Sequence, residues 1–248
     1  MNWKDNFSKQ AGSYAKYRPQ YPSHLYHFLM TLVENKRVAW DCGTGNGQVA
    51  RCLAAVFERV IATDASASQL AYAQPLPNIE YRVAPAEESG LSSSSIDLIT
   101  VAQAVHWFNF ERFYSEVRRV AHHETVIAVW GYGLLQISAS LDEILFHLYT
   151  EMLGRYWDAE RKHLDEAYQT IPFPFQEMIT PAFKMQASWY LADLIGYLNT
   201  WSSLQKFIVA ENYNPLEAIE ADLRKSWGDL NQPKTINWDI YLKVGKVN

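Results

Sequence analysis

Three glycines at alternate positions, just after an acidic residue, are the residues of this sequence best suited to holding a ligand. They are Gly43, Gly45 and Gly47, and Asp41 precedes them at the end of an apolar segment. Glycine lets a backbone approach a ligand closely because no Cβ atom intervenes. A carboxylate would repel a pyrophosphate, whereas it is favourable beside an ammonium and a sulfonium group. The stretch therefore favours an aminoacyl-nucleoside over a dinucleotide, with Asp41 either contacting the ammonium group or orienting the loop.

A second acid, Asp64, follows Asp41 by 23 residues, at the end of the next apolar segment. An acid about 20 residues beyond a glycine-rich turn accepts hydrogen bonds from ribose hydroxyls in nucleotide-binding sheets. Ribose occurs in dinucleotides and in aminoacyl-nucleosides, so Asp64 indicates a nucleoside without choosing between them. The alternative is that Asp64 caps the helix that follows.

Two further segments follow apolar strands and extend the set of candidate contacts. Ala86 and Glu87 come after the third strand, where a small residue lets the loop backbone reach an adenine edge. Ala102 and Gln103 come after the fourth strand, and His106 begins the aromatic bulk that follows them. This last segment is expected to lie beside the reactive end of the ligand.

Alternating strands and helices must position these side chains. Apolar patterning predicts five strands, over residues 37–40, 59–63, 79–83, 96–101 and 125–130. Between them the spacing of apolar residues predicts helices, and the alternation indicates a doubly wound α/β sheet with right-handed crossovers. Ligands of such sheets bind outside the carboxyl ends of the strands, where all the candidate residues fall.

Several helix boundaries are also predicted. Ser23 is expected to cap the first helix before the sheet, and Ser66 has capping-box spacing with Gln69. The helix that starts near residue 48 is expected to bury a face that includes Val56 and Phe57.

The segments outside this core have distinct expected roles. Residues 1–22, with a short helix over 8–16, are predicted to cover the site or to strap the core. Residues 133–180 are predicted to form a mostly helical insertion on the substrate side. A sixth strand over 182–190, a helix over 191–203 and a last strand over 235–244 follow. Since no linker is evident, we expect one domain over residues 1–248.

Taken together, these segments resemble class I S-adenosylmethionine (SAM)-dependent methyltransferases, and within them the small-molecule type that includes the trans-aconitate methyltransferases. The resemblance rests on residues 14–22, residues 41–47, Asp64 and residues 102–108, and it covers nearly the whole chain. It implies a seven-stranded Rossmann-like sheet whose last strand is antiparallel. It also implies that the N-terminal segment covers the cofactor.

The resemblance assigns the cofactor contacts by position. Asp64 would meet the ribose, Ala86 the adenine, and the loop at Gly43 the methionine part. The expected cofactor-binding residues are Tyr14, Arg18, Asp41, Gly43, Thr44, Gly45, Asp64, Ala65, Ala86, Glu87, Ala102 and Gln103. Many family members carry an acid beside the small residue after the third strand, where this chain has Pro85. Contact with the adenine amino group therefore falls to Glu87 or to a backbone carbonyl.

The expected reaction is in-line transfer of the SAM methyl group to a small molecule, with a carboxylate or hydroxyl acceptor favoured. A carboxylate needs no base, whereas a hydroxyl needs a proton acceptor, and His106 is the best-placed candidate. The alternative for His106 is ordinary packing and hydrogen bonding. Arg18 suits a carboxylate of substrate or cofactor, or a surface ion pair. Trp107 and Trp130 are candidate substrate contacts.

Three other functions stay open. The chain could bind SAM without catalysis, or could methylate a protein or an RNA. An NAD(P)-dependent oxidoreductase is disfavoured by Asp41 and by the tight glycine spacing.

Composition limits the partners and the cellular location that we expect. The formal net charge of the 248 residues is −5, which disfavours nucleic acid as a partner. Cys42 and Cys52 have no metal-ligand spacing, and we expect Cys42 to fill a small buried slot. Without an apolar signal core or a membrane-spanning run, a cytoplasmic location is expected. Whether the protein is a monomer or a homodimer is left open.

Overall fold

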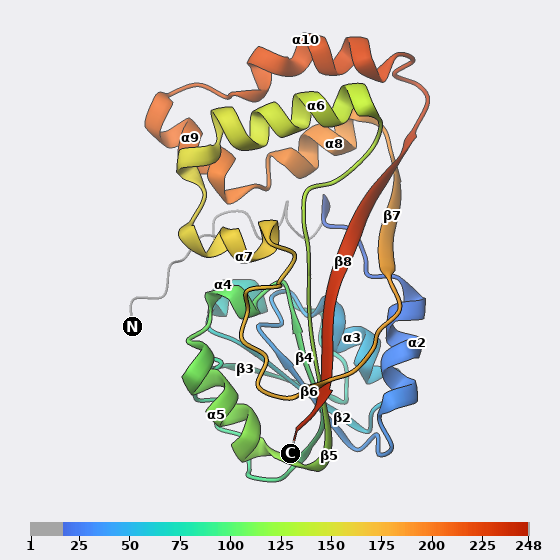
Figure 1. Ribbon diagram of the computed structural model, residues 1–248, viewed down its shortest axis with the longest axis vertical. Helices are drawn as coiled ribbons and strands as arrows, with labels where there is room; N and C mark the ends of the chain where they lie inside the picture. The colour runs from blue at the N-terminus through green and yellow to red at the C-terminus, as the bar shows by residue number, and fades with distance from the viewer. Residues whose placement is uncertain (1–16, 248) are drawn as a thin grey trace.

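The computed structural model describes residues 17–247, which are built around one mixed β-sheet (Figure 1). Its strands are β1 (Val38–Cys42), β2 (Arg59–Asp64), β3 (Ile79–Val83), β4 (Ile96–Ala102), β5 (Ala121–Tyr132), β6 (Gln176–Glu177), β7 (Phe183–Trp189) and β8 (Lys234–Lys246). The order is β3-β2-β1-β4-β5-β8-β6, and β7 also pairs with β8. Strands β1 to β5 are parallel, whereas β8 is antiparallel to β5 and β7. Apart from the two-residue β6, this confirms the predicted seven-stranded sheet with an antiparallel last strand.

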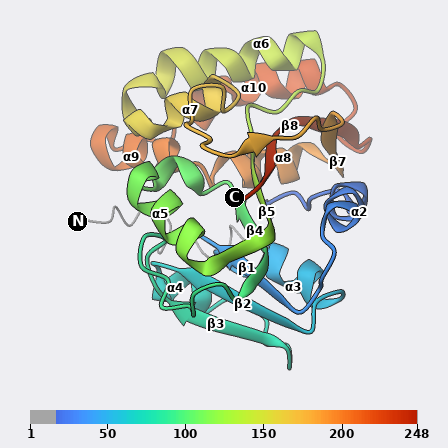
Figure 2. The ribbon, with the colours of Figure 1, turned by 60° about the horizontal axis from the view of Figure 1, so that its bottom comes forward.

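Helices cover both faces of the parallel strands (Figure 2). They are α2 (Ser23–Leu32), α3 (Gln48–Ala54), α4 (Ala67–Leu70) and α5 (Phe110–Val120). Successive strand residues point to opposite faces, so Ala39 packs in the cluster of α2 and α3 while Trp40 packs in the cluster of α5. Apolar residues on both faces explain why the strands read as nearly continuous hydrophobic runs.

Two helix-boundary predictions need correction. Ser23 is the first residue of α2, and Pro22 occupies the N-cap without a side-chain hydrogen bond. Val56 lies beyond the end of α3 and is 45 % exposed, so it does not share the buried face of Phe57. By contrast, the hydroxyl of Ser66 accepts a hydrogen bond from the amide of Gln69 and caps α4 as predicted. Cys42 is fully buried, as expected.

A layer of helices lies over the carboxyl ends of the strands, at the top of Figure 1. We call this layer the roof; it comprises α6 (Ala139–His147), the helical turns up to α7 (Lys162–Asp165), α8 (Leu191–Leu198), α9 (Ser202–Glu211) and α10 (Leu216–Trp227). The helical character of residues 139–165 agrees with the prediction. The predicted helix over 191–203 is in fact broken between α8 and α9, and α10 was not predicted. The roof is thus built from two separate stretches of chain.

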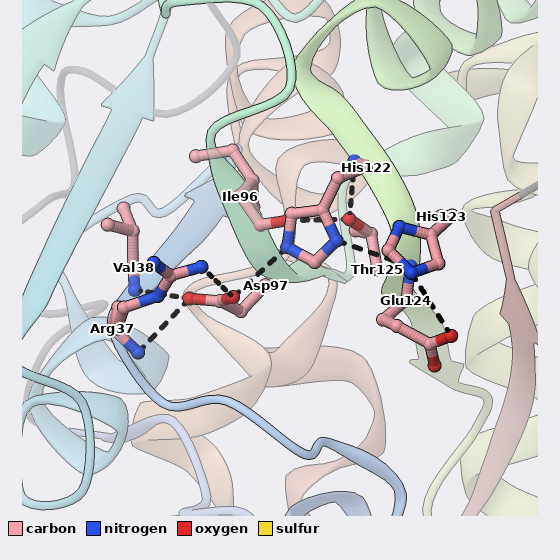
Figure 3. A network of polar contacts seen from close by, with 8 residues as sticks. All are labelled: Arg37, Val38, Ile96, Asp97, His122, His123, Glu124 and Thr125. Atoms are coloured by element: carbon pink, nitrogen blue, oxygen red, sulfur yellow. Dashed lines mark hydrogen bonds and ion pairs between the residues drawn. The ribbon is translucent and has the colours of Figure 1, made fainter.

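At the opposite end of the strands, a buried carboxylate ties three strand beginnings together (Figure 3). Oδ2 of Asp97 accepts hydrogen bonds from the amides of Arg37 at 3.0 Å and Val38 at 2.7 Å. Its Oδ1 lies 3.0 Å from Nε2 of His122, at the start of β5. Asp97 itself is only 3 % exposed, so its partners cannot readily be replaced by water.

We expect Asp97→Ala to lower the free energy of unfolding by about 3 kcal/mol, because two backbone donors and one imidazole lose their acceptor. Urea denaturation followed by far-UV circular dichroism measures the change. Asp229→Ala is the matched control, since Asp229 accepts one backbone hydrogen bond in an exposed turn. Equal losses in the two variants would contradict the structural role of Asp97.

Candidate cofactor and acceptor site

The glycine loop joins β1 to α3 and holds three left-handed backbone conformations. The φ angles of Gly43, Gly45 and Gly47 are +69°, +57° and +79°. A Cβ atom on Gly43 would lie 2.5 Å from Cβ of Ala104, and one on Gly47 would collide with the hydroxyl of Tyr81. Beyond Gly45 the space is open, with only a Gln69 atom at 3.8 Å. Gly45 alone therefore offers close approach to a ligand, whereas Gly43 and Gly47 are required by packing inside the protein.

Asp41 supports this loop from below. Its Oδ2 accepts hydrogen bonds from Oγ1 of Thr44 at 2.5 Å and from the amide of Ala50 at 3.1 Å. Its Oδ1 accepts one from Oγ1 of Thr100 at 2.8 Å. Burial raises the pKa of Asp41 to about 6, against the lowering effect of the two hydroxyls. Of the two roles considered for Asp41, these contacts are those of a residue that orients the loop.

Asp64 ends β2 next to the loop. Its Oδ2 accepts a hydrogen bond from the amide of Gly45 at 2.8 Å, and its Oδ1 accepts one from the amide of Ser66 at 2.8 Å. Burial raises the pKa of this carboxyl. Each carboxylate oxygen has two lone pairs, so acceptor capacity remains for ligand hydroxyls. The side chain that caps α4 belongs to Ser66, and the neighbouring Ala65 is exposed.

The residues after β3 and β4 lie at the same carboxyl-end edge of the sheet as the glycine loop and Asp64. Ala86 is buried, and Oε1 of Glu87 accepts a hydrogen bond from the amide of Asn109 at 2.7 Å. Ala102 is the last residue of β4, and Gln103 follows it with a φ of +54°. That conformation is costly for a residue other than glycine and is found preferentially at functional sites. Gln103 is fixed there because its side chain donates to the Tyr132 carbonyl at 3.0 Å.

A cavity with about 590 Å³ of empty space, partly open to solvent, lies between this edge and the roof. Residues from the end of β5 and from the turn after β4 form its floor, and roof residues form its walls. Its lining includes Arg18, Gln103, His106, Trp107, Trp157 and Arg161. The structure therefore brings Arg18, Gln103, His106 and Trp107 to one cavity.

His106 is nearly fully buried in the floor of this cavity, with 4 % of its surface exposed. Its Nδ1 lies 2.8 Å from the hydroxyl of Tyr168. Burial lowers the pKa of His106 to about 3, with smaller contributions from the positive charges of Arg161 and His163. The imidazole is therefore neutral at physiological pH and is a weak base.

Arg18 stands between two cavities. It lines the first one and also a second, of about 450 Å³, beside Asn46 and Gln48 of the glycine loop. Its Nη1 donates a hydrogen bond to the hydroxyl of Tyr132 at 2.8 Å, and its guanidinium lies 5.5 Å from the ring centroid of Tyr197. Arg18 thus contacts two aromatic residues, Tyr132 and Tyr197, where it borders the cavities.

Trp130, a predicted substrate contact, lies away from this cavity. Trp130 is fully buried in the core, where Tyr21 packs edge-on against it at a centroid distance of 5.5 Å. The structure therefore does not bring Trp130 to the cavity that His106 and Trp107 line. Tyr14 and the predicted helix over 8–16 lie outside the described residues.

The roof supplies cavity residues that were not predicted. Trp157 and Arg161 come from the helical turns before α7, and Tyr197 and Trp201 come from α8 and the turn after it. Trp157 and Arg161 lie within residues 133–180, the segment expected to form the substrate side, but no motif singled out these side chains.

A glycine loop after β1, an acid at the end of β2 and an antiparallel β8 beside β5 define the class I methyltransferase fold. The sequence pattern of a family described as "Methyltransferase domain" matches residues 40–129. The chain is 36 % identical to a presumed methyltransferase of Dictyostelium discoideum, over 98 % of this chain and 95 % of that protein. It is 29 % identical to a presumed S-adenosylmethionine-dependent methyltransferase of Saccharomyces cerevisiae, over 51 % of this chain and 47 % of that protein.

A solved structure of a presumed type II methyltransferase from Anaeromyxobacter dehalogenans matches with a TM-score of 0.86 and 38 % identity. The match covers 93 % of this chain and 98 % of that one. The chain belongs to the SAM-dependent methyltransferases, and SAM is its cofactor. No helix among the described residues is long and apolar enough to cross a membrane.

Proposed function

We propose that this enzyme methylates a carboxylate oxygen of a small molecule, as the resemblance to trans-aconitate methyltransferases suggests. The observation that carries the proposal is that two guanidinium groups, Arg18 and Arg161, line one aromatic cavity. Among the lining residues these two arginines face one acid, Asp158, which is ion-paired with Lys206 at 2.6 Å, and Arg161 has a second acid, Asp165, at 3.9 Å outside the lining. Positive charge is thus in excess among the residues that line the cavity. Guanidinium groups bind carboxylates in a fixed bidentate geometry.

The chain's own residues fit the cofactor on the loop side. The open space at Gly45 and the remaining lone pairs of Asp64 suit a ribose and its neighbouring groups. Arg18, which borders the second cavity, suits the amino-acid carboxylate. Thr44, Ala102 and Gln103 are assigned to the methionine end of the cofactor. Ala65 and Ala86 are assigned to the nucleoside end. Because Oε1 of Glu87 already accepts from Asn109, a backbone carbonyl is favoured as the partner of the adenine amino group.

SAM supplies a methyl group that is already activated by attachment to a sulfonium. The protein therefore has to align the acceptor oxygen and exclude water. An ionised carboxylate supplies the electron pair of the new O–CH3 bond, and no proton has to be removed. This matches a cavity in which the imidazole of His106, with a pKa of about 3, is too weak a base to deprotonate a hydroxyl well.

The second candidate is a hydroxyl acceptor with His106 as the base, since the imidazole lines the cavity. Its low pKa makes this less favourable. A protein or RNA acceptor is disfavoured by the roof over the cavity and by the net charge of −5.

Incubation with SAM and a panel of small carboxylic acids, alcohols and amines tests the proposal. We expect methyl esters, recognised by alkaline hydrolysis to methanol. We also expect kcat/KM to be constant between about pH 7 and 8, because Asp41, with a pKa of about 6, is mostly ionised there, while His106 protonates only near pH 3 and a carboxylic acid only near pH 4.

The variant His106→Gln should lose less than about tenfold in kcat, whereas loss of a general base costs about 10²- to 10⁴-fold. Alkali-stable methyl ethers would contradict the proposal, as would an ionisation near pH 6.5 that disappears in His106→Gln. A rise in melting temperature with SAM but no methylated product from the panel would favour a binding protein without catalysis.

A further inference from the structure

The roof contains one irregular turn next to the cavity. After α6 the chain forms a π-helix over Leu148–Met152. The amide of Leu153 donates to the carbonyl of Leu148 at 3.0 Å, whereas in an α-helix it would donate to the carbonyl of Tyr149. The Tyr149 carbonyl instead accepts a hydrogen bond from the indole Nε1 of Trp157 at 3.1 Å. Because of the π-helix, the backbone carbonyl of Tyr149 can hold the indole of Trp157, which forms part of the cavity wall.

The hydroxyl of Tyr149 anchors a second wall residue. It accepts a hydrogen bond from Nε of Arg161 at 2.8 Å and donates one to Oδ1 of Asp165 at 2.5 Å. Burial raises the pKa of Tyr149, so the phenol keeps the proton that it donates. Tyr149 does not itself line the cavity, whereas Trp157 and Arg161 both do.

These contacts leave the two terminal nitrogens of Arg161 able to bind a ligand. Its guanidinium lies 4.6 Å from the ring centroid of Trp157 and 5.4 Å from that of Tyr149. Nε is engaged by Tyr149 and lies 3.9 Å from Oδ1 of Asp165. Within residues 17–247, the two terminal nitrogens of Arg161 make no hydrogen bond to the protein. Held by its inner nitrogen and by stacking, the group presents the N–H donors of its two terminal nitrogens to a ligand.

The other guanidinium of the cavity is placed differently. Arg18 donates to the hydroxyl of Tyr132 and also borders the second cavity, beside the glycine loop. Arg161 borders only the cavity under the roof. Arg18 therefore borders both the cofactor side and the acceptor side, whereas Arg161 lies on the acceptor side.

We propose that Arg161 binds the anionic group of the acceptor and that Tyr149 is the positioning residue that orients Arg161 and Trp157 as one wall. This inference rests on the proposed function, because it takes the acceptor to be a small carboxylate. Tyr149 acts through Arg161, so removal of its hydroxyl should matter only while Arg161 is present.

A double-mutant cycle with Tyr149→Phe, Arg161→Ala and their combination tests the inference. Malonate, benzoate and citrate are the probes, titrated into the SAM-loaded protein while its tryptophan fluorescence is recorded. For the tightest-binding probe we expect Kd to rise about tenfold in each single variant. The double variant should bind no more weakly than Arg161→Ala alone.

A ¹⁵N NMR measurement follows the Nε–H group of Arg161 without any acceptor, with its signal assigned by its absence in Arg161→Ala. We expect this proton to exchange with water at least tenfold faster in Tyr149→Phe. Tyr156→Phe is the matched control, since Tyr156 also places its hydroxyl between an arginine and a carboxylate, those of Arg155 and Glu211, but in exposed hydrogen bonds outside the cavity. It should change neither measurement.

The outcomes separate this inference from the proposed function. If no probe binds the wild-type enzyme, the carboxylate acceptor is overturned, and with it the role of Arg161. If a probe binds equally well to Arg161→Ala, only the present inference is overturned. Additive effects in the double variant, or an unchanged exchange rate in Tyr149→Phe, would show that Tyr149 does not act through Arg161.

Discussion

Asp64→Ala is expected to weaken the binding of SAM by about 100-fold or more. A hydrogen bond to a charged acceptor contributes about 1.5–3 kcal/mol, and a ribose offers two hydroxyls to this carboxylate. Since about 1.4 kcal/mol corresponds to a tenfold change in Kd, even the lower figure gives about two orders of magnitude. The variant also releases the amide of Gly45, which loosens the loop. Isothermal titration with SAM and with S-adenosylhomocysteine measures the effect.

Two control variants separate the ribose contact from the local structure. Asp64→Asn keeps an acceptor for the amide of Gly45 but removes the charge, and should bind with intermediate affinity. Ser66→Ala removes the cap of α4 without touching the carboxylate, and should leave Kd within about threefold of the wild-type value. If Asp64→Ala bound SAM as tightly as the wild type, Asp64 would have to be regarded as a purely structural residue.

Gly43→Ala should cost about 3 kcal/mol or more of unfolding free energy. The backbone at Gly43 has a φ of +69°, and a Cβ atom there would lie 2.5 Å from that of Ala104 and 3.3 Å from the ring of Phe108. The left-handed conformation alone costs about 1–2 kcal/mol for a residue with a Cβ, and overpacking adds about 1–3 kcal/mol. The loop after β1 and the turn after β4 would be pushed apart, so SAM binding should weaken as well.

Gly90→Ala is a matched control for the cost of the left-handed backbone conformation. The φ angle of Gly90 is +68°, but a Cβ atom there would meet nothing within 4 Å. Gly90→Ala should therefore cost only about 1–2 kcal/mol, and the difference between the two variants isolates the steric collision. Adding Ala104→Gly to Gly43→Ala should restore part of the lost stability. Equal denaturation midpoints for Gly43→Ala and Gly90→Ala would refute the packing argument.

The parallel half of the sheet could be predicted because each of its strands can be recognised from its own residues. Segments such as 96–101 are mostly apolar, and each ends next to the candidate ligand-binding residues. The roof gives no such signal. Its helices are held by packing between segments that lie far apart in the chain, as when α10 packs against α6. A π-helix at Tyr149 also depends on tertiary contacts, so its effect on Arg161 could not be read from residue spacing.

The charge of Asp41 led to the right class of ligand, although the structure gives this carboxylate contacts within the protein. Its charge disfavoured a pyrophosphate and so indicated SAM, which the relatives support. In the structure, however, its oxygens bind two threonine hydroxyls and one backbone amide. These partners come from the loop, from α3 and from β4, and their convergence on one carboxylate depends on the register of the sheet. The closeness of Asp41 to the loop residue Thr44 can be read from the sequence. Its contact with Thr100 of β4 cannot.

The assembly of the roof from two distant stretches bears on how acceptor preference changes during evolution. Trp157 and Arg161 belong to one stretch and Tyr197 to the other, while the glycine loop and Asp64 belong to neither. Recombination that exchanged only one stretch would join unmatched halves of the cavity over an intact cofactor site. New specificities should therefore be inherited as paired substitutions in residues 139–165 and 191–227. A chimera designed to accept another metabolite should transplant both stretches together.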